Sequence, residues 1–191
     1  KDLRYFVLAF FKFAILATMG ECIGLRISQG CYNKKGFGIM PRAIVWGVLG
    51  VCISIAMGIF AGGTFGFLHY FGLDINPMNI NSQCFGTKLL YAFSVSVLMN
   101  SFFAPVFMTI HKITDTHIIN TKGTLKGFFS PIPVGNIIKN LNWDVQWNFV
   151  IKKTIPFFWY PAHTITFLLP NEYRVLCAAL LGVALGIILS I

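Results

Sequence analysis

The stretch that most constrains the fold is the C-terminal run from Val175 to Ile191, which holds about 17 residues without a charged side chain. This run is long enough, as a helix, to cross most of a membrane hydrocarbon core of ~30 Å. Small residues recur at every fourth position and therefore share one helix face; they are Ala178, Gly182, Gly186 and Ser190. Because such a face lets two backbones approach closely in lipid, we expect this helix to pack tightly against another.

The composition extends this prediction to the whole chain. Hydrophobic residues make up 56% of it and charged residues only 11%, whereas a soluble domain is about a quarter charged. The formal net charge is +9, but most cations flank apolar runs and form no basic stripe or nucleic-acid motif. We therefore expect the partners to be the lipid bilayer, its anionic headgroups and a second copy of the chain in a homo-oligomer, and not nucleic acid.

The apolar runs predict an all-α membrane protein, in which residues 1–191 form one domain, a compact bundle of four or five transmembrane helices. The expected spans are 5–25, 43–71, 89–110, 154–169 and 173–191. The span 154–169 is short, so it either crosses the membrane or re-enters on the same side. A second small-residue face is expected in span 43–71, at Gly58, Gly62 and Gly66.

Two further features modify this bundle. Prolines disturb a helix by removing a donor, and four are expected to bend or break the spans: Pro105, Pro156, Pro161 and Pro170. The last three predict a broken fourth segment. Residues 137–150 carry Trp143 and Trp147 beside polar residues, which predicts an interfacial amphipathic helix.

The cations also predict the topology. Connectors 26–42 and 111–153 are rich in lysine, whereas the connector between them is nearly neutral. By the positive-inside tendency, the two lysine-rich connectors face the cytoplasm, or the matrix in a mitochondrion.

Ionisable and amide side chains inside the spans are the candidate functional residues, because such groups are costly in lipid and usually face a cavity or a partner. The expected lining of a pore or polar core is Lys12, Glu21, Asn100, His163 and Thr164. Glu21 pairs either with Arg26 or headgroup water at the span end, or with Asn100 across the bundle. Arg42 and Arg174 are expected at a pore mouth or as interfacial anchors.

No motif for catalysis or for a cofactor is found. His111, Asp115 and His117 match no zinc spacing and are expected in a polar connector, so neither a metal nor a cofactor is predicted. The sequence also lacks a phosphate loop, an activated-nucleophile motif and a dinucleotide fingerprint, and we do not expect an enzyme.

Several of these positions carry a family pattern. Gly20-Glu21 ends the first span, Arg42 begins the second, and Asn100 precedes Pro105 by five residues. The C-terminal part has Trp143, then Trp159-Tyr160-Pro161, then Pro170 with Tyr173-Arg174. This pattern resembles the family named for the Mpv-seventeen protein of the mitochondrial inner membrane and the twenty-two-kilodalton peroxisomal membrane protein.

The chain departs from that family at several polar positions. Glu21 stands for an aspartate, His69 for a tryptophan, Asn100 for a glutamine and Met99 for an aspartate. The resemblance therefore indicates a distant branch, with the cytoplasmic membrane of a prokaryote favoured over a mitochondrial inner or peroxisomal membrane. It implies a small polytopic membrane protein, for which a pore or metabolite-channel role is proposed in the family.

Three functions remain open from the sequence. The first is a pore or transport path for small solutes or ions, lined by the polar residues named above. The second is a non-catalytic membrane scaffold or assembly protein, whose small-residue faces bind partners. The third, an intramembrane enzyme, requires two polar groups within hydrogen-bond reach of each other.

Overall fold

The computed structural model describes residues 3–188, and within that range it contains helices and no β-strand. The elements are α1 (Leu3–Gln29), α2 (Ile39–His69), the 3₁₀ helix η1 (Pro77–Ser82), α3 (Phe85–Phe102), α4 (Ala104–Asn120), α5 (Leu125–Phe128), α6 (Val134–Asn140), the π-helix η2 (Val145–Trp159), α7 (Tyr160–Leu168) and α8 (Asn171–Ile188).

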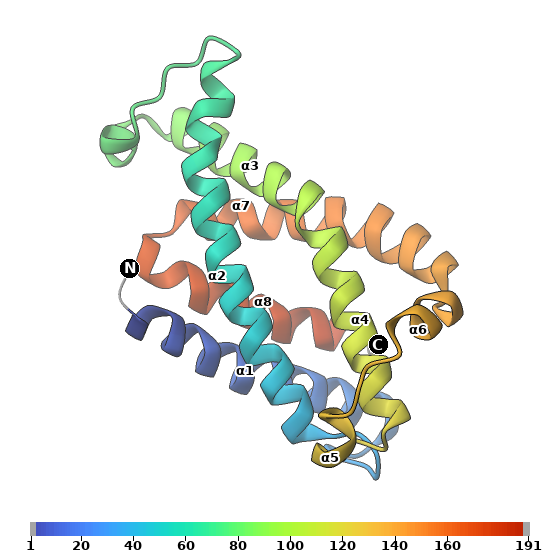
Figure 1. The fold of residues 1–191 in the computed structure, drawn as a ribbon. Helices are drawn as coiled ribbons and strands as arrows, with labels where there is room; N and C mark the ends of the chain where they lie inside the picture. The colour runs from blue at the N-terminus through green and yellow to red at the C-terminus, as the bar shows by residue number, and fades with distance from the viewer. Residues whose placement is uncertain (1–2, 189–191) are drawn as a thin grey trace.

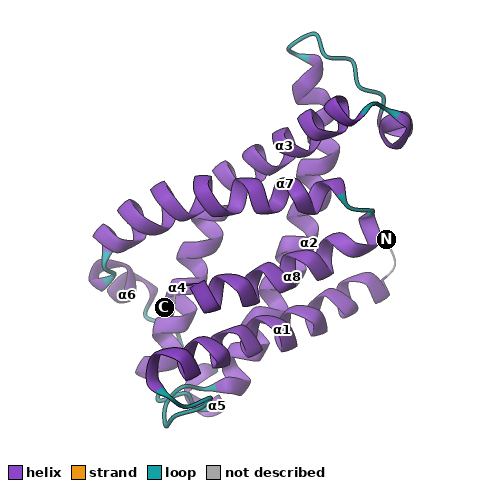
Figure 2. Cartoon of the chain, turned by 180° about the vertical axis from the view of Figure 1, so that it is seen from behind, coloured by secondary structure: helices purple, strands orange, loops and turns teal. Residues whose placement is uncertain are grey.

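The long helices form two layers. Helices α1, α8 and the η2–α7 run lie roughly side by side, and α2 and α4 cross one face of that layer (Figures 1 and 2). Helix α1 packs against both α2 and α8, and α3 packs against α7. One hydrophobic core draws on α1, α2, α3, α7 and α8 together, so these helices form a single packed unit.

Small residues set the closest approach between α1 and α8. A Cβ added at Gly20 of α1 would lie 2.7 Å from Cα of Val183, and one at Gly186 of α8 would lie 2.9 Å from the Gly20 carbonyl oxygen. Ala178 is also buried, and a Cβ at Gly182 would contact Ala17. The face expected from the sequence is therefore the one that packs on α1, apart from Ser190, which lies outside the described residues.

The small-residue face of α2 behaves differently. Gly58, Gly62 and Gly66 are exposed, and a Cβ built at Gly62 or Gly66 would meet nothing within 4 Å. Two other glycines contact α1 instead, since a Cβ at Gly47 or Gly50 would meet the ring of Phe10 or Phe13. The four-residue spacing identifies the small-residue faces of both α2 and α8, but it does not show which of the two packs against another helix of the same chain.

The segment expected as one span, 89–110, is two helices with a bend of 47° between them. Pro105 lies in the first turn of α4, where its missing N–H is tolerated and its ring disfavours continuing the preceding helix. The second helix runs on to Asn120, so residues 111–120 are helical and the prediction of a polar connector there is wrong.

The fourth segment also differs from its prediction. Residues 145–168 form a continuous helical run, in which Pro156 lies inside the π-helix η2 and Pro161 lies in the first turn of α7. Only Pro170 coincides with a break, between α7 and α8. A lost donor at each of these prolines does not end a helix whose other backbone bonds persist. The expected amphipathic helix 137–150 is divided between α6 and η2.

Within residues 3–188, two helices, α1 and α2, are long and apolar enough to cross a membrane, and the bent pair α3–α4 is a third candidate if it is one span. Helix α2 has 31 residues, or about 46 Å at 1.5 Å per residue, and exceeds a ~30 Å core. Apolar helices of this length are compatible with an integral membrane protein.

Candidate functional site

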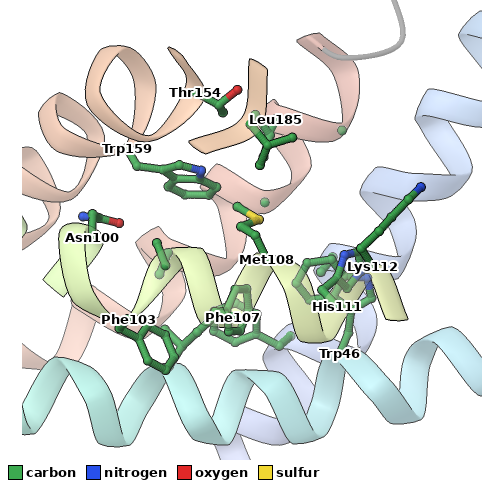
Figure 3. Close-up of a pocket in the computed structure, with 18 of the residues that line it drawn as sticks. Trp46, Asn100, Phe103, Phe107, Met108, His111, Lys112, Thr154, Trp159 and Leu185 are labelled. Atoms are coloured by element: carbon green, nitrogen blue, oxygen red, sulfur yellow. The ribbon is translucent and has the colours of Figure 1, made fainter. Parts of the chain in front are cut away.

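A cavity of about 290 Å³ lies at the centre of the helices. Side chains from α1, α2, α3, α4, η2, α7 and α8 line it, and most of them are apolar. Figure 3 shows Met108, Phe107 and Trp159 projecting between the two layers. Its polar lining falls into two groups, one around Glu21 and His111 and one around Asn100 and His163.

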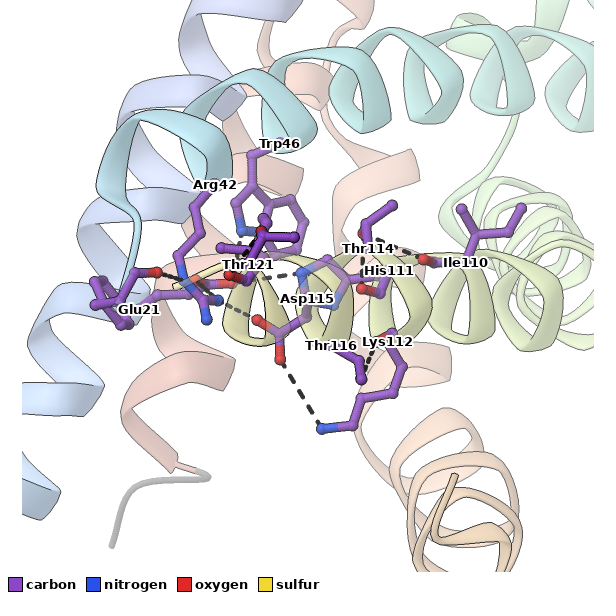
Figure 4. A network of polar contacts seen from close by, with 12 residues as sticks. Glu21, Arg42, Trp46, Ile110, His111, Lys112, Thr114, Asp115, Thr116 and Thr121 are labelled. Atoms are coloured by element: carbon purple, nitrogen blue, oxygen red, sulfur yellow. Dashed lines mark hydrogen bonds and ion pairs between the residues drawn. The ribbon is translucent and has the colours of Figure 1, made fainter. Parts of the chain in front are cut away.

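The first polar group is centred on Arg42 of α2. Arg42 Nη1 forms an ion pair of 2.6 Å with Glu21 Oε2 of α1 and a second ion pair with Asp115 of α4. Its Nε donates to the Phe37 carbonyl at 2.8 Å. The Arg42 side chain is only 9% exposed (Figure 4). One guanidinium thus joins three helices, because its fork of donors can bind more than one oxygen at once.

Glu21 has additional donors. Trp46 Nε1 donates to Glu21 Oε1 at 2.8 Å, and His111 Nε2 lies 3.4 Å from the same oxygen. The rings of Trp46 and His111 pack with centroids 4.4 Å apart. Both Glu21 oxygens are therefore occupied, and Glu21, Trp46, His111 and Asp115 form part of the cavity wall. We name this group the Arg42 cluster: Glu21, Arg42, Trp46, His111 and Asp115.

Regular helix geometry explains how the cluster assembles. Arg42 and Trp46 are four residues apart on α2, and His111 and Asp115 are four apart on α4, so each pair shares a helix face. Because α4 continues past residue 110, where the span was expected to end, His111 and Asp115 lie against α2. Sequence reasoning missed this group because it assigned residues 111–120 to a connector. The signal was present, since no glycine or proline follows Pro105 until Gly123.

The second polar group connects α3 to α7 by hydrogen bonds. His163 Nδ1 lies 3.0 Å from Asn100 Oδ1, and Asn100 Nδ2 donates to the Ser96 carbonyl at 2.8 Å. Ser96 Oγ donates to the Tyr160 carbonyl at 2.8 Å. The Trp159 ring stacks on His163, with centroids 5.0 Å apart. All of these side chains are buried, so their hydrogen bonds satisfy groups that water does not reach.

The structure thus brings Glu21, Asn100 and His163 to one cavity, but it does not pair Glu21 with Asn100 or with Arg26. Thr164 is buried and donates to the Tyr160 carbonyl at 2.6 Å, and it is not among the lining residues. Lys12 is half-buried and also does not line the cavity.

Arg42 and Arg174, which were expected at a pore mouth or as interfacial anchors, lie at different sites in the fold. Arg42 is in the buried cluster described above. Arg174 donates through Nε to the Leu169 carbonyl at 3.0 Å and through Nη2 to the Phe167 carbonyl at 2.9 Å. It therefore satisfies carbonyls at the end of α7, where intrahelical donors are missing.

Metal chemistry finds no support in the part of the chain that the structure describes. No group of three or more His, Cys, Asp or Glu side chains in residues 3–188 could hold a metal ion. His117, which the sequence groups with His111 and Asp115, instead lies with Nε2 3.2 Å from the Phe128 carbonyl oxygen.

Comparisons with known proteins find no matching family model, no matching curated protein and no matching solved structure.

Proposed function

We propose that the chain is an integral membrane protein whose central cavity is part of a transport path for small solutes. Its five membrane-crossing segments would be α1, α2, the bent pair α3–α4, the η2–α7 run and α8. The η2–α7 run supports the fifth crossing, because it has 24 residues in continuous helix.

The distribution of side chains supports the membrane assignment. Large apolar side chains cover the outer faces of the helices, and polar ones are buried inside. Examples of the outer group are Phe11 and Ile15 of α1 and Val48 and Ile59 of α2, all more than half exposed. Ser96, Asn100 and His163 are among the buried polar group. This arrangement suits a protein surrounded by lipid, where an apolar exterior is favourable and polar groups need internal partners.

The single observation that carries the transport proposal is the cavity with two separate polar groups in its wall. The Arg42 cluster lies in one part of the wall and joins α1, α2 and α4 by ion pairs. The Asn100–His163 pair lies at α3 and α7. A path through the cavity would pass between these groups, so opening it would require the Arg42 ion pairs to rearrange.

The proposed topology keeps the lysine-rich connectors on the cytoplasmic or matrix side. A contact between those connectors supports a common side, since a Cβ at Gly123 would lie 2.6 Å from the Gly38 nitrogen. Helix η1, in the near-neutral connector, lies at the far end of α2 and α3 (Figure 1). We also propose that this membrane is the cytoplasmic membrane of a prokaryote, rather than a mitochondrial inner or peroxisomal membrane, and that the resemblance to the Mpv-seventeen family reflects distant kinship.

A scaffold role is the second candidate, and one observation favours it. The glycine face of α2 (Gly58, Gly62 and Gly66) is exposed in the described structure, and a Cβ at Gly62 or Gly66 would meet nothing within 4 Å, so the face would admit close approach of a partner helix.

Flux measurement tests the transport proposal. Met108 projects into the cavity (Figure 3), so Met108→Trp fills part of the path. In liposomes with equal protein insertion, we expect wild type to pass small solutes above the rate of empty liposomes and Met108→Trp to pass at least about tenfold less. The matched control is Met19→Trp, because Met19 is 44% exposed on the outside of α1.

Two results would contradict the proposal. One is wild-type flux equal to that of empty liposomes across small ions and organic solutes, which would favour the scaffold. The other is equal loss of flux in Met108→Trp and Met19→Trp, which would remove the cavity from the path.

A further inference from the structure

Two connectors meet at the end of the molecule where α1 ends and α2 begins. Residues 30–38 join α1 to α2, and residues 121–124 join α4 to α5. A Cβ built at Gly36 would lie 3.8 Å from Cα of Lys122, and one at Gly38 would lie 2.8 Å from Cα of Gly123. Helix α5 lies beside the first of these connectors (Figures 1 and 2). Charged residues that are far apart in the sequence are therefore neighbours in the fold.

Four lysines lie at this meeting point without a carboxylate partner. All four are exposed, and we name them the lysine junction: Lys34, Lys35, Lys122 and Lys126. Within residues 3–188 none of them forms an ion pair, and Lys34 Nζ donates to the neutral Gln29 Oε1 at 2.8 Å. The sequence has no aspartate or glutamate from 22 to 73 or from 116 to 143. The junction is therefore a concentrated positive charge that attracts anions from outside the chain.

Lys122 has an unusual backbone conformation. Its φ is 57°, and it is the only residue other than glycine with a positive φ in the range that the structure describes. It follows the end of α4, where the Gly123 N–H donates to the Ile118 carbonyl at 2.8 Å and the Lys122 N–H donates to the Ile119 carbonyl at 3.0 Å. Glycine is the usual residue at this position of such a helix end, because a Cβ is disfavoured at positive φ. Lysine here costs conformational energy that glycine would avoid, and it adds a cation to the junction.

The junction also borders an apolar surface. An open hollow of about 460 Å³ lies between the two connectors, and its lining combines Lys34 and Lys35 with Met40 of the first turn of α2 and Leu125 of α5. Met40 is 61% exposed and Leu125 is 46% exposed. A phosphate free in water would leave these apolar side chains unused. A phospholipid offers both a phosphate for the lysines and acyl chains for the apolar lining, and basic pockets on the cytoplasmic side of membrane proteins bind such headgroups.

We propose that the lysine junction binds an anionic phospholipid of the surrounding bilayer. Its phosphate oxygens accept from the lysine ammonium groups, and its acyl chains lie against Met40 and Leu125. The site requires the membrane location proposed above but not the transport path, because no residue that lines this hollow lines the central cavity.

Native mass spectrometry of the full chain, purified in detergent, tests the proposal by measuring bound lipid. The probes are dioleoyl phosphatidylglycerol, which is anionic, and dioleoyl phosphatidylcholine, which has the same acyl chains and no net charge. A third probe, glycerol 3-phosphate, has the phosphate and no acyl chains. We expect phosphatidylglycerol to bind at least about tenfold more tightly than either of the others, because each lysine near an anionic lipid contributes ~1 kcal/mol.

Lys122→Gly is the most informative variant, because it removes a cation and relieves the strained φ together. It should weaken phosphatidylglycerol binding by about fivefold and leave the midpoint of chemical unfolding unchanged or raise it. Combining it with Lys35→Gln and Lys126→Gln should weaken binding by roughly a hundredfold. The matched control is Lys139→Gln, because Lys139 is exposed on α6 and does not line the hollow. This control should bind phosphatidylglycerol as tightly as wild type.

Three results would overturn the proposal. The first is equal binding of phosphatidylglycerol and phosphatidylcholine. The second is equal binding of glycerol 3-phosphate and phosphatidylglycerol, which would indicate a site for a soluble phosphate. The third is unchanged phosphatidylglycerol binding in the triple variant, or a loss that Lys139→Gln reproduces. Flux through the central cavity is tested separately by Met108→Trp, so failure of the lipid site and failure of the transport proposal are distinguishable.

Discussion

Replacing Arg42 with methionine is expected to destabilise the protein by about 3–5 kcal/mol, because the substitution removes the buried guanidinium that pairs with the carboxylates of both Glu21 and Asp115. Glu21 and Asp115 are only 18% and 15% exposed at their side chains, so water compensates them poorly. The loss should appear as a lower midpoint of chemical unfolding in detergent micelles. Arg42→Lys should recover only part of it, since an ammonium lacks the fork that reaches both carboxylates and the Phe37 carbonyl.

The control and the rescue make this prediction specific. Arg4→Met removes an exposed arginine at the start of α1 and should leave the midpoint unchanged. Adding Glu21→Gln and Asp115→Asn to Arg42→Met removes the uncompensated charges, so it should restore more than half of the lost stability. Wild-type stability in Arg42→Met alone would show that the ion pairs do not hold the three helices together.

The second large effect is expected at the contact between α1 and α8. Gly20→Ala should cost about 1–3 kcal/mol, because the new methyl group would lie 2.7 Å from Cα of Val183 and the two backbones would have to separate. This loss opposes the gain of up to ~1 kcal/mol that alanine brings over glycine inside a helix.

Gly62→Ala in α2 is the matched control, since a Cβ there meets nothing within 4 Å. Gly62→Ala should leave the unfolding midpoint unchanged or raise it, because alanine favours the helix more than glycine does. A Gly20→Ala protein as stable as Gly62→Ala would contradict the close approach of α1 and α8. Destabilisation of Gly62→Ala would instead indicate that the exposed face of α2 is covered by a partner in the micelle.

The sequence predicts much of the helical architecture and some of the site. Helical periodicity assigns residues to faces, which is why the small-residue face of α8 was found. Polar residues inside apolar runs are few, which is why Glu21, Asn100 and His163 were chosen, and all three line the cavity. Their partners were not predicted, because spacing along one helix says nothing about which neighbouring helix faces it.

The errors have local physical causes. The polar composition after residue 110 predicts a connector at His111 and Asp115, but α4 continues through both residues to Asn120. Pro156 was expected to break its segment, but η2 accommodates it within π-helical turns. That same change of helical repeat is what brings Gln146 and Trp159 to the cavity, and a pattern analysed with a 3.6-residue period could not reveal it.

The measurement that tests the central claim most directly is the accessibility of a cysteine placed in the cavity. Three variants each keep a single cysteine in sealed liposomes: Cys31 in the first connector, Cys84 at the start of α3, and Met108→Cys in the cavity. A membrane-impermeant thiol reagent should modify Cys31 and Cys84 from opposite sides of the membrane. It should modify Met108→Cys from both sides. A Met108→Cys thiol that reacts only after the protein is unfolded would show a sealed core and contradict a transport path through the cavity.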